Sequence, residues 1–324
     1  MTRPSRWSKC RSAWRAATAA LFIVVAARAT PAAAQACCTG GALVNPVRLA
    51  PYEDYAIGLQ TRVRSDLGSF APDGRFIWTS TGQGPASTEQ DLEQDLAASF
   101  RPSRRAQLGF VLPYVETRRL ESGVGDWGGG IGDLALDARY DFKLAAEMLY
   151  WPGFALLAGV VFPTGKAVGD GTNPASTDAT GTGTFSASLG ADLEKVHGPL
   201  YGALNAWLTY SGSSTVTLPA PVGPQTTSYP LQVTLLAVAG YVFENEMAAA
   251  LYLNFLERGD DTLNGMTQFG TVLRLTTVGA TGLLPVGDAW RISASIFSDV
   301  MISAFGRNEQ GGAGVTASLV RPWR

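Results

Sequence analysis

Hydrophobic and polar residues alternate strictly between Asp133 and Phe142. One set of alternate positions is wholly apolar (Leu134, Leu136, Ala138, Tyr140, Phe142), and the other carries four charges (Asp133, Ala135, Asp137, Arg139, Asp141). A period of two is the side-chain period of a β-strand. Versions of this pattern recur about a dozen times along the chain, which is typical of a transmembrane β-barrel.

The pattern predicts twelve strands whose connections alternate between long and short for most of the chain. Long loops on one side and short turns on the other are typical of an outer-membrane barrel. After residue 258 the predicted connections become nearly equal, so the rule weakens there. The predicted strands are 55–64, 92–101, 106–117, 131–143, 153–163, 183–195, 200–210, 230–243, 248–257, 267–277, 289–299 and 312–321.

Aromatic residues gather at both ends of the predicted strands, as the two membrane–water interfaces favour. A soluble β-sandwich could also collect aromatics at its strand ends. The loop asymmetry and an export signal favour the barrel. We therefore predict an all-β protein, with residues 54–324 forming a transmembrane antiparallel up-and-down β-barrel of about twelve strands in the outer membrane.

The N-terminal region predicts export. A basic leader precedes an apolar run over residues 16–27, and an A-x-A cleavage site ends at Ala36, so residues 1–36 are predicted to be a secretory signal peptide. Residues 37–53 are then expected to form a periplasmic N-terminal segment. Cys37 and Cys38 would begin the mature chain, with two alternatives: lipidation of Cys37, or a local or intermolecular disulfide. Metal binding by the pair is disfavoured because no His or further Cys accompanies it.

Charge excludes one class of partner. The leader holds six of the 25 basic residues and none of the 27 acidic ones, which leaves 19 against 27 and a net charge of −8 for the mature chain. This charge argues against a nucleic-acid partner and fits a protein of the cell envelope. The expected partners are outer-membrane lipid and a small-molecule solute, and the sequence leaves the oligomeric state open.

Two segments resemble a known family, the outer-membrane transporters named for the meta-pathway of phenol degradation. The resemblance covers residues 105–320 in pattern and 125–195 in motif. It implies an outer-membrane barrel associated with the passage of aromatic or other hydrophobic molecules, and it carries over no catalytic residue. The matching motifs are Gly130-Ile131-Gly132-Asp133-Leu134 with Ala138-Arg139-Tyr140, and Phe162-Pro163-Thr164-Gly165-Lys166 with Gly181-Thr182-Gly183-Thr184.

An enzyme is the weaker hypothesis. Hydrolases of the outer membrane need an activated Ser and a His base. The single histidine, His197, falls in a short turn at the predicted periplasmic rim. No metal-ligand spacing or phosphate-binding pattern is present, so no catalytic residue, cofactor or metal site is predicted.

The polar positions of the strands predict the wall of a lumen. The predicted pore-lining residues are Arg62, Arg64, Asp133, Asp137, Arg139, Arg274 and Asp299. Such charges could orient solutes in a narrow channel or pair to plug the lumen. We expect a channel or transporter for passive uptake or diffusion of small hydrophobic or aromatic molecules. The alternative is a closed structural or adhesive barrel whose extracellular loops bind partners.

Overall fold

The computed structural model describes Ala42, Asn45 and residues 47–79, 87–121, 124–148, 150–218, 223–287 and 289–324. The predicted signal peptide and Cys37 and Cys38 lie outside these residues. No helix among them is long and apolar enough to cross a membrane.

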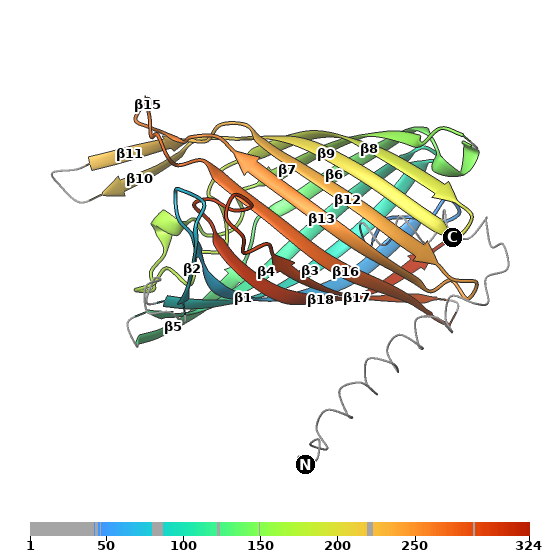
Figure 1. Ribbon diagram of the computed structural model, residues 1–324, viewed down its shortest axis with the longest axis horizontal. Helices are drawn as coiled ribbons and strands as arrows, with labels where there is room; N and C mark the ends of the chain where they lie inside the picture. The colour runs from blue at the N-terminus through green and yellow to red at the C-terminus, as the bar shows by residue number, and fades with distance from the viewer. Residues whose placement is uncertain are drawn as a thin grey trace, which may run out of the picture.

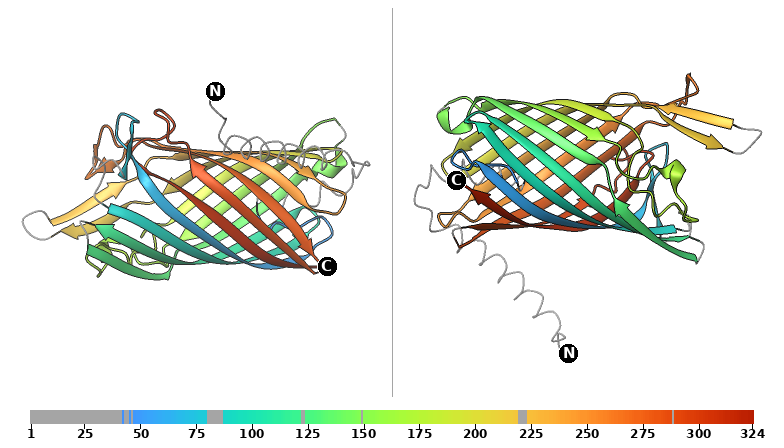
Figure 2. Two further views of the ribbon diagram at one scale, coloured as in Figure 1. Left: turned by 60° about the horizontal axis from the view of Figure 1, so that its bottom comes forward. Right: turned by 180° about the vertical axis from the view of Figure 1, so that it is seen from behind.

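Twelve strands form one closed antiparallel barrel, which confirms the predicted fold class (Figure 1). Each pairs with its neighbour along the barrel, and the last pairs with the first, as Figure 2 shows where β18 runs beside β1. The barrel strands are β1 (Tyr55–Phe70), β3 (Ser87–Ser103), β4 (Ala106–Glu121), β6 (Leu134–Lys143), β7 (Gly153–Phe162), β8 (Ser186–His197), β9 (Leu200–Ser211), β12 (Gln232–Val242), β13 (Ala248–Arg258), β16 (Leu273–Val286), β17 (Trp290–Asp299) and β18 (Gln310–Trp323).

Shorter elements lie in the connections, most of them at one end of the barrel. β2 pairs with β1 and β5 pairs with β4, while four further strands make a separate small sheet in the order β10-β11-β14-β15. Figure 1 shows β10 and β11 projecting beyond the wall. The short elements are β2 (Phe76–Trp78), β5 (Val124–Ile131), β10 (Ser214–Leu218), β11 (Gly223–Ser228), β14 (Thr262–Leu263), β15 (Met266–Thr267) and the 3-10 turns η2 (Ala145–Glu147) and η3 (Val168–Asp170).

The connections alternate in length around the whole barrel. β16 begins at Leu273 and runs to Val286, so the prediction of a strand at 267–277 followed by a loop was wrong there. The turn from β16 to β17 is therefore short, and Gly287 adopts the left-handed backbone that such a turn favours (φ 58°). Long loops thus gather at one end of the barrel, the long-loop end, and short turns at the other, the short-turn end.

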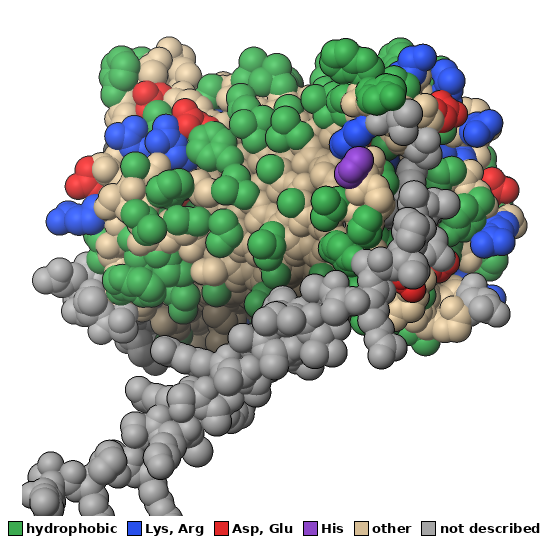
Figure 3. Space-filling model, turned by 45° about the vertical axis from the view of Figure 1, so that its right-hand side comes forward, with side chains coloured by type: hydrophobic (Ala, Val, Ile, Leu, Met, Phe, Trp, Pro, Cys, Tyr) green, Lys and Arg blue, Asp and Glu red, His purple; other side chains and the backbone are tan. Residues whose placement is uncertain are grey.

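The outer wall carries an apolar band between two aromatic belts. Figure 3 shows hydrophobic side chains along the wall and charged side chains gathered toward the two ends. At the short-turn end Tyr55 stacks on Phe100, with ring centroids 5.4 Å apart. At the long-loop end Phe162 meets Phe185 at 5.8 Å. This arrangement matches the two membrane–water interfaces and confirms the predicted position of these aromatics.

Candidate functional site: the barrel lumen

Exposure along β1 shows which side chains face the lumen. Tyr55, Ile57 and Leu59 are half exposed on the outer wall. Ala56, between Tyr55 and Ile57, is only 1% exposed. Because side chains alternate between the two faces of a strand, Gln60, Arg62 and Arg64 share the inner face with Ala56. These three side chains therefore lie on the lumen side of β1 and border the cavity described below.

A short stretch before β1 lies inside the barrel. It consists of Ala42 and residues 47–50 and is called the inner stretch below. Val47 and Leu49 are buried against Ala56, Ala97 and Val320 on the inner wall. Ala42 is buried among inward side chains of β9, β12, β13 and β16: Tyr201, Ala203, Val238, Val242, Ala248, Ala250 and Leu283. Within residues 37–53, the segment expected to be periplasmic, Ala42, Val47 and Leu49 are buried in the short-turn half of the lumen. Burial of these apolar side chains explains the placement.

Wall side chains bind the backbone of this stretch. The N–H of Leu49 donates to Oε1 of Gln107 (3.1 Å), and the guanidinium of Arg101 donates to the carbonyl of Leu49 (2.7 Å). The N–H of Ala50 donates to Glu53, whose carboxylate also pairs with Arg291 of β17 (3.3 Å). Buried backbone groups need such partners, so the stretch is held in one conformation.

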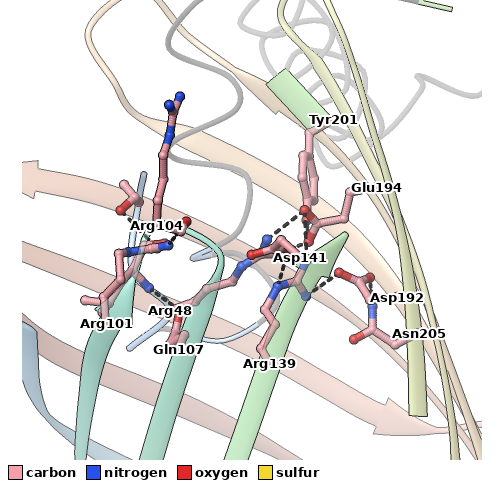
Figure 4. A network of polar contacts seen from close by, with 12 residues as sticks. Arg48, Arg101, Arg104, Gln107, Arg139, Asp141, Asp192, Glu194, Tyr201 and Asn205 are labelled. Atoms are coloured by element: carbon pink, nitrogen blue, oxygen red, sulfur yellow. Dashed lines mark hydrogen bonds and ion pairs between the residues drawn. The ribbon is translucent and has the colours of Figure 1, made fainter. Parts of the chain in front are cut away.

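An ionic network joins this stretch to the inner face of β6 and β8 (Figure 4). Arg139 of β6 pairs with Asp141 (2.8 Å) and with Asp192 of β8, and it lies 3.5 Å from Glu194. Arg48 also pairs with Glu194. Both terminal nitrogens of its guanidinium donate to the carboxylate, with Nη2 lying 2.7 Å from Oε2. Two arginines therefore lie among three carboxylates. All five side chains are largely buried, so each charge depends on the others.

Neutral side chains complete the network. The hydroxyl of Tyr201 donates to Glu194 (3.1 Å), and the amide of Asn205 donates to Asp192 (2.7 Å). Both come from β9, the strand next to β8. The network therefore joins the inner stretch to three strands of the wall, β6, β8 and β9.

The long-loop half of the lumen contains a cavity of about 410 Å³. Arg62 pairs with Glu93 on its wall. Arg64 pairs with Asp66 (3.1 Å) and Asp299 (3.3 Å), and Asp299 also accepts a bond from Thr277 (2.7 Å). The rest of the lining has two amides, Gln60 and Asn254, and apolar and hydroxyl side chains, among them Leu236, Val238, Tyr252, Leu275, Thr281, Ser293, Ser295, Phe297 and Thr316, and Ala42 forms part of its floor.

Asp133 lies at the rim, between β5 and β6. It accepts hydrogen bonds from the N–H groups of Gly165 (2.9 Å) and Thr182 (2.7 Å) and thereby fastens both ends of the loop between β7 and β8. Within this loop, hydrogen bonds from Lys166 and, to a smaller extent, from Thr172 stabilise the charged form of Asp178. They hold the pKa of its carboxyl well below the usual range. The role of Asp133 in the structure is thus to anchor a loop.

Six of the seven predicted lumen residues lie on the lumen side or at its rim, in three groups. Arg62, Arg64, Arg139 and Asp299 face the lumen in ion pairs, and Asp133 lies at the rim. Asp137 shares the inner face of β6 with Arg139 and packs over Gly109 of the adjacent strand.

The prediction for Arg274 was wrong about its direction. Thr277 and Leu275 of β16 line the lumen cavity, and Val278 and Leu284 are exposed on the outer wall. Arg274 alternates in phase with the outer pair, and it binds Glu257 of β13 at 2.8 Å near the long-loop end. The predicted strand began six residues early and ended before Val278, so it left out the outward side chains that determine this face.

Two functional features escaped prediction. Arg48 stands outside any alternating segment, so no period indicated that it enters the lumen. Glu93 and Asp95 did carry a signal, since they alternate with Leu92 and Leu96 in β3.

His197 is exposed at the end of β8. Among the described residues, no group of His, Cys, Asp or Glu could hold a metal ion.

The structure is similar to the crystal structure of the COG4313 outer membrane channel from Pseudomonas putida F1. The TM-score is 0.70 at 14% identity, covering 86% of this chain and 98% of that chain. The two chains share the fold of a closed outer-membrane β-barrel. The β domain of the Bordetella autotransporter BrkA (TM-score 0.47, 11% identity, 84% and 100% covered) and the TodX monoaromatic hydrocarbon channel (0.43, 13%, 87% and 93%) are more distant. No protein-family model and no curated protein sequence matches the chain.

Proposed function

We propose that this protein is a channel for the passive uptake or diffusion of small hydrophobic or aromatic molecules across the outer membrane. The observation that supports it is the lumen cavity, which combines apolar side chains such as Leu236, Leu275 and Phe297 with hydroxyl groups. Its volume of about 410 Å³ lies in the range of small-molecule sites. No step of covalent chemistry belongs to this proposal.

Charge pairing favours uncharged solutes over ions. Arg62 has Glu93 as its partner, and Arg64 has Asp66 and Asp299, so the arginines of the cavity wall are already neutralised. An ion entering this space would meet little net charge and would lose water. A small molecule with an apolar body loses little hydration and buries its surface against the wall.

The inner stretch sets an upper limit on solute size. Ala42 forms part of the cavity floor, and Val47 and Leu49 occupy the inner wall near the short-turn end. We infer that only small molecules pass while this stretch remains in place. Pore-lining roles for Arg62, Arg64, Asp137, Arg139 and Asp299 belong to the same proposal.

Solute flux into liposomes tests the proposal. Vesicles containing the purified protein should swell in small amphipathic solutes faster than empty vesicles, with little uptake of sugars of greater width. Vesicles with the heat-unfolded protein provide the control for leakage. Equal swelling with and without the folded protein would contradict the channel proposal.

A structural or adhesive barrel is the second candidate, and one observation favours it. The sheet β10-β11-β14-β15 projects beyond the wall, and the loop after β15 exposes Phe269 (89%). An adhesive barrel predicts that removing residues 213–229 abolishes attachment of cells to a surface and that solute flux is absent. A channel predicts that flux survives the same deletion.

A further inference from the structure

Aromatic side chains and glycines alternate in one row across four neighbouring strands of the lumen wall. Tyr252 of β13 is directly opposite Gly279 of β16, and Gly279 is opposite Phe297 of β17. Phe297 in turn is opposite Gly314 of β18, which has Arg64 of β1 as its next neighbour. The two aromatic residues thus have a glycine beside them in the direction of strand pairing.

Each ring occupies the space that a side chain on its glycine neighbour would need. A Cβ atom on Gly314 would lie 2.5 Å from Cζ of Phe297, and one on Gly279 would lie 2.5 Å from the hydroxyl of Tyr252. No real Cβ atom approaches so closely. The rings are therefore laid along the wall, which keeps the centre of the lumen free, and a ring packed over a glycine on a neighbouring strand is a known stabilising device in sheets.

Both rings line the lumen cavity. Tyr252 and Phe297 border it together with Leu236 and Leu275. Arg64 at the end of the row is held by Asp66 and Asp299, so it forms a fixed boundary of this surface. A solute in the cavity therefore meets two aromatic rings whose positions are fixed before it arrives.

We propose that Tyr252 and Phe297 form a stacking surface that selects flat molecules over saturated molecules of the same size. The inference rests on the proposed channel function and names the residues that determine its specificity. A flat solute can stack on a fixed ring, whereas a puckered ring touches it at fewer atoms. Stacking on one ring corresponds to about a 2- to 12-fold preference.

Swelling of protein-containing liposomes in two matched solutes tests this proposal. L-phenylalanine and L-cyclohexylalanine share one backbone and carbon skeleton and differ in the flatness of the ring. The wild-type protein should admit phenylalanine about 2- to 12-fold faster at low concentration. The double variant Tyr252→Leu with Phe297→Leu should admit both solutes at nearly equal rates.

Three further variants keep the result specific. Phe255→Leu removes a ring from the outer face of the same strand and should leave the preference unchanged. Tyr252→Phe and Phe297→Tyr retain a ring and should retain the preference. The glycines themselves are left intact, since a Cβ on Gly279 would also meet the carbonyl of Ile296 at 2.7 Å and disturb strand pairing.

The possible outcomes separate this inference from the function on which it rests. Equal wild-type rates for the two solutes would overturn the stacking surface and leave the channel standing. A preference that survives in the double variant, shown to be folded by its heat-modifiable mobility on gels, would also overturn it. Absence of flux for both amino acids would overturn the stacking surface, and the channel would fall with it if the small amphipathic solutes also failed to enter.

Discussion

The two halves of the lumen are built from opposite materials. In the short-turn half, Arg139 and Arg48 lie among buried carboxylates and a stretch of chain packs beside them. In the long-loop half, aromatic and aliphatic side chains surround a cavity, and ion pairs are confined to its wall. Charged groups and the inner stretch therefore occupy part of the first half, whereas apolar side chains and hydroxyl groups line the cavity of the second, although the same strands run through both.

The difference shows how charge and small residues divide the work of shaping a lumen. A buried charge is stable only when it is paired with an opposite charge. The five charged groups of the network are therefore packed close together and hold the inner stretch against the wall. Glycine has the reverse effect, since Gly279 and Gly314 let neighbouring rings lie along the wall. The stability of the short-turn half should therefore be sensitive to the loss of one charge. Solute selection in the long-loop half should be sensitive to the loss of an aromatic ring.

Arg139→Met should have the largest effect on stability. The substitution leaves the buried carboxylates of Asp141 and Asp192 without the cation that pairs with them. It should lower the free energy of unfolding by about 3–5 kcal/mol. Urea titration of the barrel in lipid vesicles, followed by its mobility on gels, measures this loss. Arg62→Met is the matched control, because the Arg62 pair with Glu93 is partly exposed and its loss should cost about 0–1 kcal/mol. Equal losses in the two variants would contradict the proposed contrast between the halves.

Arg48→Met should have the next largest effect, and mainly on conduction. Glu194 keeps Arg139 (3.5 Å) and the hydroxyl of Tyr201 (3.1 Å), so the wall retains its network. The inner stretch loses its ionic contact, which weakens its attachment by about 1–3 kcal/mol. Current through single channels in a planar bilayer should increase. Arg75→Met, in an exposed turn, is the control, and an unchanged current for Arg48→Met would show that this pair does not hold the stretch.

These features differ in how much of them the sequence contains. Alternation is local, so the strands, their number and the facing of Arg62, Arg64 and Arg139 could be predicted. The prediction ended the tenth strand too early, at residue 277 instead of Val286, and the cause is non-local. Gly279 and Gly282 weaken the local strand pattern, and Tyr252 of β13, which packs over Gly279, is far away in the sequence. The inner stretch could not be predicted at all, since its partners Gln107 and Glu194 are 58 and 146 residues away.

Asp178→Asn should have a smaller effect, confined to the loop between β7 and β8. Lys166 and Thr172 lower the pKa of Asp178, so its contribution to loop order is complete above the ordinary pKa of 3.8 and is lost only as pH falls below that value. Wild-type amide protection of residues 164–185, measured by hydrogen exchange and corrected for intrinsic rates, should be equal at pH 7 and pH 4.5. The variant should be less protected at both. A wild-type loss between these two pH values would contradict this role for Asp178.

Arg274→Met should have the smallest effect and gives the sharpest check on which way this part of the wall faces. Arg274 lies on the outer side of β16 with Glu257, partly exposed at the long-loop end, so its loss should cost about 0–1 kcal/mol. Ion selectivity of the residual current, measured as the reversal potential in a salt gradient, should not change. Arg62→Met removes a positive charge from the cavity wall and should shift that potential toward cations, since Glu93 is then left without its partner. A shift of similar size for Arg274→Met would mean that this side chain faces the lumen after all, and the alternation of Leu275 and Thr277 with Val278 argues against that outcome.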